Sequence, residues 1–312
     1  MTGPANRTTN TDGGYSTYNW RGQQLLSVTS LRKVIGTPFN LVQWIVAQNI
    51  DAAIIAGNEG GYPFPEAEGP VNENEAADLL RWAPTIDLDV FKKLKKDAAG
   101  SDKKKADSAK RKLTEYRRPI RAGADAERDV AADLGSRVHH AAEQRLTIAQ
   151  ADEDVRPFLR QFYAAERELD METLLSEAQV FNLEAGYAGS LDLLARITIP
   201  AQLDRPAERI ATVLDIKTGK DVFVDHLLQD LFYAYGEFIG KDDVVHEHAT
   251  RLLHEAQGVG ILHLRPDHWE LIDLRPPTET RDILLGLARV ANFYHANPTI
   301  DPFVASRTRG EA

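Results

Sequence analysis

A chain of 312 residues is long enough for one large domain or two, and it can bury a hydrophobic core without disulfides. Its 43% hydrophobic and 27% charged residues exclude a collagen, a wholly disordered chain and a multispanning membrane protein. The sequence has no cysteine, which excludes disulfides, thiolate metal sites, cysteine nucleophiles and cysteine-ligated iron–sulfur clusters.

The net charge of −10 is unevenly distributed along the chain. Residues 92–121 contain 13 lysines and arginines against 4 acidic residues. Such a block predicts either a basic arm that contacts nucleic acid or an ordinary solvated helical face. Residues 1–24 lack the apolar segment of a signal peptide, and the most apolar run, 41–57, is interrupted by polar residues. We therefore expect a cytoplasmic protein with no membrane partner.

The first third of the chain predicts helices and loops. Residues 1–14 are polar and rich in Gly, Asn and Thr, so we expect disorder there. Ser27, Thr29 and Ser30 are candidate N-caps of a helical stretch that runs to Ile55. A Gly- and Pro-rich loop and a short helix follow, over residues 58–74 and 75–82.

A charged helical hairpin is expected next, over residues 87–121. Its turn would lie at residues 100–102, where Gly, Ser and Asp follow one another. Pro119 and Gly123 are expected to end its second helix, because proline cannot donate the backbone hydrogen bond of a helix interior.

From residue 125 the pattern is that of a globular core. Two helices, 125–146 and 156–169, precede segments with strand-like alternation. The predicted strands are 174–183, 186–197, 210–218, 258–264 and 269–274, and the later helices are 225–239 and 280–295. This order predicts an α/β (α+β) fold, with a small mixed sheet flanked by helices. The expected domains are an N-terminal helical region with a disordered start (1–84), a basic helical hairpin (85–124) and the core (125–312).

Asp215 and Lys217 carry the first chemical signal. They lie two positions apart on a predicted strand, so their side chains share a face, while Ile216 points into the core. A carboxylate that holds a divalent cation beside a lysine that orients water suits phosphodiester hydrolysis. The pair also fits an ordinary ion pair at a strand edge.

Two further residues lie where they can join this pair. Asp192 is on the preceding strand, and a hairpin would bring it beside Asp215 to form an oxygen-rich site for Mg²⁺ or Mn²⁺. His139 lies four residues after Gly135 on one helix face and next to the apolar stripe. Taken alone, Asp192 is equally a turn residue and His139 a hydrogen-bonded structural histidine.

Gln229 and Tyr233 are four residues apart on the helix that follows the Asp215 strand. Their polar ends face the same way, and they can contact a phosphate, a base or the loop that holds Lys217. The alternative interpretation is helix amphipathicity, with Tyr233 at the edge of the core.

These motifs occur in a specific order: G-x-x-x-H at 135–139, G-x-x-D at 189–192, D-x-K-T-G-K at 215–220 and Q-x-x-x-Y at 229–233. Together they resemble the RecB-like branch of the PD-(D/E)XK nuclease superfamily. The chain is similar, over residues 125–295, to compact phage exonucleases related to the CRISPR-associated RecB-like nuclease.

The resemblance implies a restriction-endonuclease-like core and assigns roles residue by residue. The implied metal ligands are His139, Asp192, Asp215, the backbone carbonyl of Ile216 and, as a supporting or second-metal contact, Glu177. The implied catalytic set is Lys217, Asp215, Asp192, Gln229 and Tyr233. The four-cysteine iron–sulfur cluster of many relatives must be absent here, because there is no cysteine.

The implied activity is a Mg²⁺- or Mn²⁺-dependent deoxyribonuclease, an exonuclease on linear DNA ends in recombination, repair or phage DNA processing. No nucleotide cofactor is expected, since the 214–221 segment departs from the phosphate-binding loop pattern. A phage-encoded protein would act in the host cytoplasm. Family analogy adds a single-strand annealing protein and a homo-oligomer as partners. The residues expected to clamp DNA phosphates are Lys103, Lys104, Lys105, Lys110, Arg111, Lys112, Arg117 and Arg118.

Three alternatives stay open at this point. The first is a catalytically silent module that binds DNA ends on the same fold. The second is a phosphodiesterase that acts on RNA or nucleotides. The third is a carboxylate-based glycosidase, which would leave Lys217 unexplained and need no divalent ion.

Overall fold

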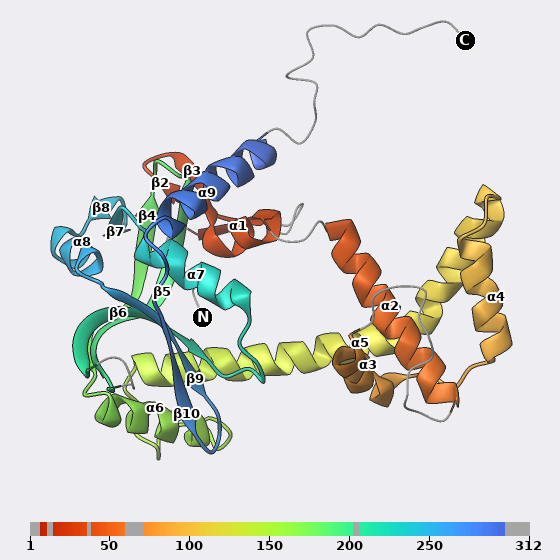
Figure 1. Cartoon of the computed structure of the whole chain (residues 1–312), viewed down its shortest axis with the longest axis horizontal. Helices are drawn as coiled ribbons and strands as arrows, with labels where there is room; N and C mark the ends of the chain where they lie inside the picture. Colours follow the sequence, from red (N-terminus) through yellow and green to blue (C-terminus); the bar gives the residue numbers. More distant parts are fainter. Residues whose placement is uncertain (1–6, 11–14, 36–38, 60–71, 202–205, 297–312) are drawn as a thin grey trace, which may run out of the picture. The chain divides into compact units, whose positions relative to one another are not determined.

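The structure is a computed structural model, shown in Figure 1. It describes residues 7–10, 15–35, 39–59, 72–201 and 206–296. The chain forms two compact units: residues 1–36 together with 134–312, and residues 37–133. This division differs from the boundaries expected after residues 84 and 124, because the N-terminal strands join the core sheet.

Ten strands are joined into one mixed sheet within the larger unit. They are β1 (Arg7–Asn10), β2 (Tyr15–Trp20), β3 (Gln23–Ser27), β4 (Glu172–Asn182), β5 (Tyr187–Ile199), β6 (Glu208–Lys217), β7 (Phe238–Lys241), β8 (Val244–Val245), β9 (Gly258–Leu264) and β10 (Trp269–Leu274). Most neighbours are antiparallel, whereas β3–β5 and β6–β9 are parallel. The predicted mixed α/β class is confirmed, with a larger sheet than expected.

The N-terminal strands correct the expectation of a purely helical start. Arg21 and Gly22, both at positive φ, form the two-residue turn between β2 and β3. Trp20 packs its ring against Phe181 of β4 at a centroid distance of 4.5 Å. Residues 7–10 form β1, and the rest of the segment expected to be disordered lies outside the described residues.

The helices follow the predicted order with several differences in length. They are α1 (Val28–Ile35), α2 (Phe39–Glu59), α3 (Glu73–Leu79), η1 (Leu80–Trp82), α4 (Leu88–Ala98), α5 (Lys103–Glu143), α6 (Arg156–Glu168), α7 (Val224–Ala234), α8 (Glu247–His254) and α9 (Thr280–Ala296). The Ser27 Oγ accepts a hydrogen bond from the Ser30 backbone N–H at 3.0 Å, so Ser27 is an N-cap of α1. Helix α7 ends earlier than predicted, and α8 was not predicted.

The smaller unit contains the expected α4–α5 hairpin, with its turn at residues 99–102. The prediction that Pro119 and Gly123 end the second helix was wrong, because α5 continues through both to Glu143. Leu113 and Ile120 are buried in one apolar cluster on either side of Pro119, and this packing offsets the lost backbone hydrogen bond.

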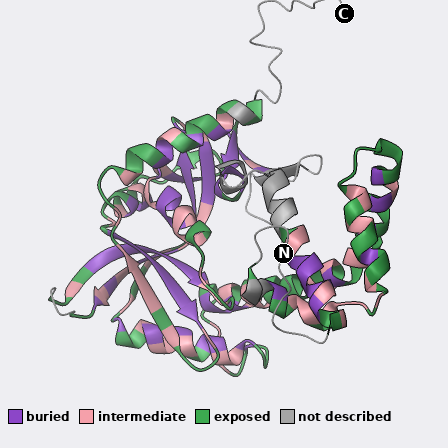
Figure 2. Ribbon diagram, turned by 45° about the vertical axis from the view of Figure 1, so that its right-hand side comes forward, coloured by how far each residue is buried: buried purple, intermediate pink, exposed green. Residues whose placement is uncertain are grey.

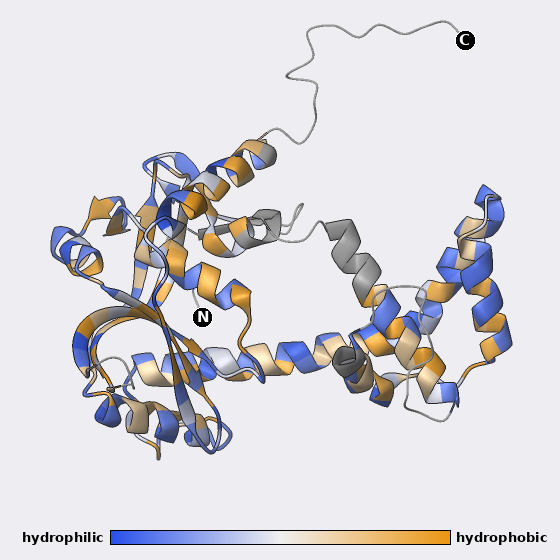
Figure 3. Cartoon of the chain, viewed as in Figure 1, coloured by the Kyte–Doolittle hydropathy of each residue, from blue (hydrophilic) through white to orange (hydrophobic). Residues whose placement is uncertain are grey.

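Apolar side chains pack on both faces of the central sheet. Figure 2 shows that much of this sheet is buried. One cluster joins α1, α7 and α9 to the sheet, and the other joins the end of α5 and α6 to it. Figure 3 shows the apolar residues concentrated in these strands and in the helix faces that cover them. Among the described residues, no helix is both long and apolar enough to cross a membrane.

Candidate metal centre

Strand register brings three carboxylates into one row across the sheet. The pairing of Leu193 with Leu214 places Asp192 of β5 opposite Asp215 of β6 at the next position. Glu177 of β4 lies between the residues paired with positions 193 and 191 of β5, so it faces Asp192. Opposed residues of neighbouring strands project from the same face, so the row Glu177–Asp192–Asp215 concentrates negative charge.

His139 reaches this row from the last turns of α5. Its Nε2 lies 2.7 Å from the backbone oxygen of Ile216, and its Nδ1 lies 3.3 Å from Oδ2 of Asp192. The Ile216 backbone N–H donates to the same Asp192 oxygen at 2.9 Å. Thus His139, Asp192 and the Ile216 carbonyl, which lie far apart in the sequence, come together.

A possible metal site is formed by His139, Glu177 and Asp192. One ligand atom from each lies within 4.8 Å of the others. One imidazole and two carboxylates form a donor set that suits several divalent cations, so the donors do not identify the metal. Glu177 therefore takes a more central place than the supporting contact that the resemblance implies.

Asp215 lies deeper than the other carboxylates. Its side chain is only 2% exposed, and its carboxylate forms an ion pair with the Lys217 ammonium. Lys217 is paired with the Oδ2 atom of Asp215, whereas Oδ1 has no hydrogen-bond partner among the described residues. Burial, with the Asp192 carboxylate, raises the pKa of Asp215 to about 7, although Lys217 opposes the shift. An additional cation beside Asp215 would favour its ionised form.

Glu177 is strained as well as crowded. Its backbone φ of +49° lies in the left-handed region, which non-glycine residues seldom adopt. The residue as a whole is exposed, yet protein partly surrounds its carboxyl group. This partial burial, with the Asp192 carboxylate, raises the pKa of Glu177 to about 7. The Ser190 Oγ donates to Glu177 only at 3.4 Å, a weak hydrogen bond.

Gln229 and Tyr233 support the row from α7. The Gln229 side-chain amide donates to the Tyr233 hydroxyl at 2.9 Å. The buried Tyr233 ring lies against Gly189, where a Cβ would overlap ring atom Cε1. Burial and the Asp192 charge raise the pKa of Tyr233, which keeps its hydroxyl protonated. The Gly189 position thus needs glycine so that Tyr233 can lie beside the strand that carries Asp192.

Two residues that hold the loop after Lys217 were missed from the sequence. His263 Nε2 lies 2.8 Å from the Gly219 backbone oxygen, and the Arg265 guanidinium donates to the backbone oxygens of Thr218 and Gly219. His263 is opposite Lys217 in the parallel β6–β9 register. The available signal was a histidine inside the predicted strand 258–264 with an arginine directly after that strand, but this pattern has no metal-ligand spacing.

Gly135 lies close to the loop that follows Lys217. A Cβ at Gly135 would lie 3.2 Å from the Thr218 Oγ1, so this loop passes close to α5 here. The G-x-x-x-H motif therefore combines a contact to this loop with the His139 side chain on one face of the helix.

The basic residues of α5 are not equally available. Lys103, Lys104, Lys110, Arg111 and Lys112 are exposed. Arg117 donates two hydrogen bonds of 2.7 Å to Asp51, whose side chain is 2% exposed. Lys105 pairs with Asp97, and Arg118 with Glu115. The buried pair with Asp51 takes Arg117 out of the expected DNA-contacting set.

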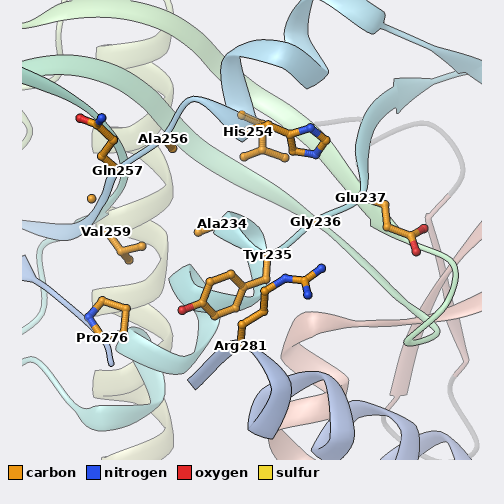
Figure 4. Close-up of a pocket in the computed structure, with 12 residues that line it drawn as sticks. Ala234, Tyr235, Gly236, Glu237, His254, Ala256, Gln257, Val259, Pro276 and Arg281 are labelled. Carbon is orange, nitrogen blue, oxygen red and sulfur yellow. The ribbon is translucent and has the colours of Figure 1, made fainter. Parts of the chain in front are cut away.

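A cavity of about 520 Å³ lies elsewhere on the larger unit, beside the start of β9 (Figure 4). Tyr235 and Arg281 lie next to each other in its wall. None of the carboxylates of the row lines this cavity. The candidate metal site is therefore separate from this cavity.

The fold and this cluster define a mixed α/β protein with a candidate divalent-metal centre beside a lysine. Neither a family model nor a curated protein sequence matches the chain. A solved structure described as "Crystal structure of SSO0001" is 15% identical, with a TM-score of 0.26 over 52% of this chain and 74% of that chain. So low a TM-score supports no argument about fold or function.

Proposed function

We propose that the protein is a metal-dependent deoxyribonuclease, and specifically an exonuclease that acts on linear DNA ends. The proposal depends chiefly on one observation: His139, Glu177 and Asp192 converge next to the Asp215–Lys217 pair. Carboxylate-held metal beside a lysine is a constellation suited to phosphodiester hydrolysis. The ordered motifs of the sequence supply the analogy to a nuclease family.

The residues present fit a divalent cation. The buried Oδ1 of Asp215 has no hydrogen-bond partner among the described residues, and two carboxyls of the row have a pKa raised to about 7. Both features reflect negative charge that Lys217 compensates only in part, and a bound cation would add to that compensation. In this proposal His139, Glu177, Asp192 and Asp215 hold Mg²⁺ or Mn²⁺, which when bound would offset charge on the phosphate.

The chain's own groups have distinct roles in the proposed reaction. Lys217 orients the attacking water from its Nζ and offsets negative charge that develops on the phosphate oxygens. Tyr233, fixed by Gln229 and by contact with Gly189, holds the segment of β5 that carries Asp192. The Thr218 and Gly219 carbonyls, bound by Arg265, set the course of the loop after Lys217.

Exposed lysines and arginines of α5 provide the proposed DNA contact. Lys103, Lys104, Lys110, Arg111 and Lys112 would bind backbone phosphates without reading the sequence. Each neutralised phosphate adds about 0.9 to the slope of log affinity against log salt on duplex DNA. Replacing residues 103–105 with glutamate should flatten that slope, and an unchanged slope would exclude these lysines from binding.

The test is cleavage of end-labelled linear duplex, linear single-stranded and closed circular DNA, each with Mg²⁺, Mn²⁺ or EDTA. We expect metal-dependent loss of the linear substrates and survival of the circle. Lys217→Met should abolish cleavage, whereas Lys241→Met, an exposed lysine at the end of β7, should not. DNA binding without cleavage in every metal would favour the silent end-binding module instead. A protein that neither binds nor cleaves DNA would refute the proposal.

A further inference from the structure

Helix α9 carries apolar residues beyond the face that packs on the core. The face directed to the core, beside α1, carries Leu284, Leu285, Ala288 and Ala291. A neighbouring outer stripe, turned roughly 120° from the core face around the helix axis, carries Ile283, Leu287 and Val290, which are 58%, 37% and 52% exposed. A helix that packs only on its own domain carries polar residues on its outer face. The outer face of α9, Ile283–Leu287–Val290, therefore has the composition of an interface.

The spacing of this outer face is that of a helix–helix seam. Its three residues follow one another at four and then three positions, as apolar residues do in paired helices. Gly286 lies on the same face, three positions after Ile283 and four before Val290. A Cβ at Gly286 would meet no described atom within 4 Å. Packing against the described part of the chain thus does not require glycine there, although glycine is a poor residue for a helix interior.

The charged residues beside the outer face are arranged so that two copies of α9 would be complementary to each other. Asp282 and Arg289 lie seven residues apart on the same flank of α9, and the midpoint between them is next to Gly286. In an antiparallel helix pair the same flanks meet, so Asp282 of each copy faces Arg289 of the other. Both side chains are at least half exposed, and Arg289 also pairs with the exposed Glu184.

We propose that the outer face of α9 is the interface of a symmetric dimer, in which α9 pairs antiparallel with α9 of a second copy. A two-fold interface uses one surface twice and must be self-complementary. The apolar seam and the Asp282–Arg289 flank meet that requirement, and Gly286 at the crossing lets the two backbones approach closely. This proposal is independent of nuclease activity.

Sedimentation velocity over a concentration series, in EDTA, tests the interface. The wild-type chain should move from 34.7 kDa to twice that mass as concentration rises. Leu287→Asp should keep it at 34.7 kDa, whereas Val130→Asp, an equally drastic change at an exposed residue of α5, should leave the dimer intact. A wild type that is monomeric throughout, or a dimer that survives Leu287→Asp, overturns the proposal. A dimer that forms only after deletion of residues 297–312 also overturns the proposal, because residues 297–312 would then cover the outer face of α9 in the full chain.

Charge exchange tests the antiparallel orientation. Asp282→Arg or Arg289→Asp alone should weaken the dimer about tenfold, because attraction becomes repulsion at two symmetric positions. The double variant re-forms both pairs with reversed sign and should restore wild-type affinity. Gly286→Ala should weaken the dimer without lowering the thermal midpoint of the monomer. Failure of the double variant to restore affinity, or a dimer that Gly286→Ala leaves unchanged, contradicts this geometry.

Discussion

Divalent metal should stabilise the larger unit against heat, by an amount that binding linkage sets. His139, Glu177 and Asp192 meet only in the folded chain, so a metal held by all three binds the folded state alone. At a free metal concentration 100 times the dissociation constant, the gain is about 2.7 kcal/mol. For a unit of roughly 215 residues, each kcal/mol shifts the midpoint by about 2–4 °C. The expected rise is therefore about 5–11 °C.

Scanning calorimetry of the full chain in EDTA, Mg²⁺ and Mn²⁺ measures this rise without DNA or catalysis. Asp192→Asn should remove most of it, because this carboxylate lies between the two others of the row. Asp267→Asn is the matched control, since its carboxylate is exposed in the β9–β10 turn. A shift below about 1 °C in both metals, or an equal shift in Asp192→Asn and wild type, would refute the metal centre.

The other predictions concern pH, a buried ion pair and a glycine. Without metal, the thermal midpoint should fall as pH rises from about 4 to 7. The reason is that burial and the Asp192 carboxylate raise the pKa values of Glu177 and Asp215 to about 7, so both carboxyls bind protons more tightly in the folded chain. Glu177→Gln should therefore make the thermal midpoint fall less steeply with pH. Arg117→Met removes the closer ion-pair partner of the buried Asp51 and leaves it with Lys95 at 3.4 Å. The free energy of unfolding, measured by urea denaturation, should fall by about 3 kcal/mol, and a fall below about 1 kcal/mol would contradict the importance of this pair. Gly189→Ala should displace Tyr233 and lower both the thermal midpoint and DNA cleavage, whereas Gly286→Ala should lower neither.

The sequence predicted the elements of the core well because each has a clear period and clear ends. The five predicted strands between residues 174 and 274 correspond to β4, β5, β6, β9 and β10. The hairpin from β9 to β10 has the predicted bounds, since a Pro-Asp turn separates two short runs rich in apolar residues. Where the hydrophobic period and the turn residues agreed, these local signals were sufficient to predict the element without knowledge of its tertiary contacts.

Tertiary packing decided the cases that were predicted wrongly. Pro119 stays inside α5 because apolar residues on both sides of it are buried in one cluster. The β2 and β3 segments carry few apolar residues and gave a weak strand signal. They are strands because they complete the edge of a sheet whose partner β5 is more than 150 residues away. No local pattern reports a partner at that distance.

The candidate site could be predicted in part for a related reason. Asp215 and Lys217 are neighbours on one strand, so their proximity follows from local geometry. The position of Asp192 beside Asp215 follows once the two consecutive strands are paired as an antiparallel hairpin. Glu177 was harder to place, because its backbone has a positive φ, a local distortion of β4 that the sequence pattern does not predict.

The strongest structural reason to regard this row as functional is that several destabilising features coincide there. Like charges on adjacent strands repel, and Glu177, Asp192 and Asp215 form such a row. Glu177 adds an unfavourable backbone conformation, and Asp215 adds a buried oxygen, Oδ1, that has no hydrogen-bond partner among the described residues. A protein under selection for stability alone would lose each of these features by a single substitution. Strain of this kind concentrates at functional sites, and one bound cation would relieve both the repulsion and the negative charge of Asp215 that Lys217 compensates only in part.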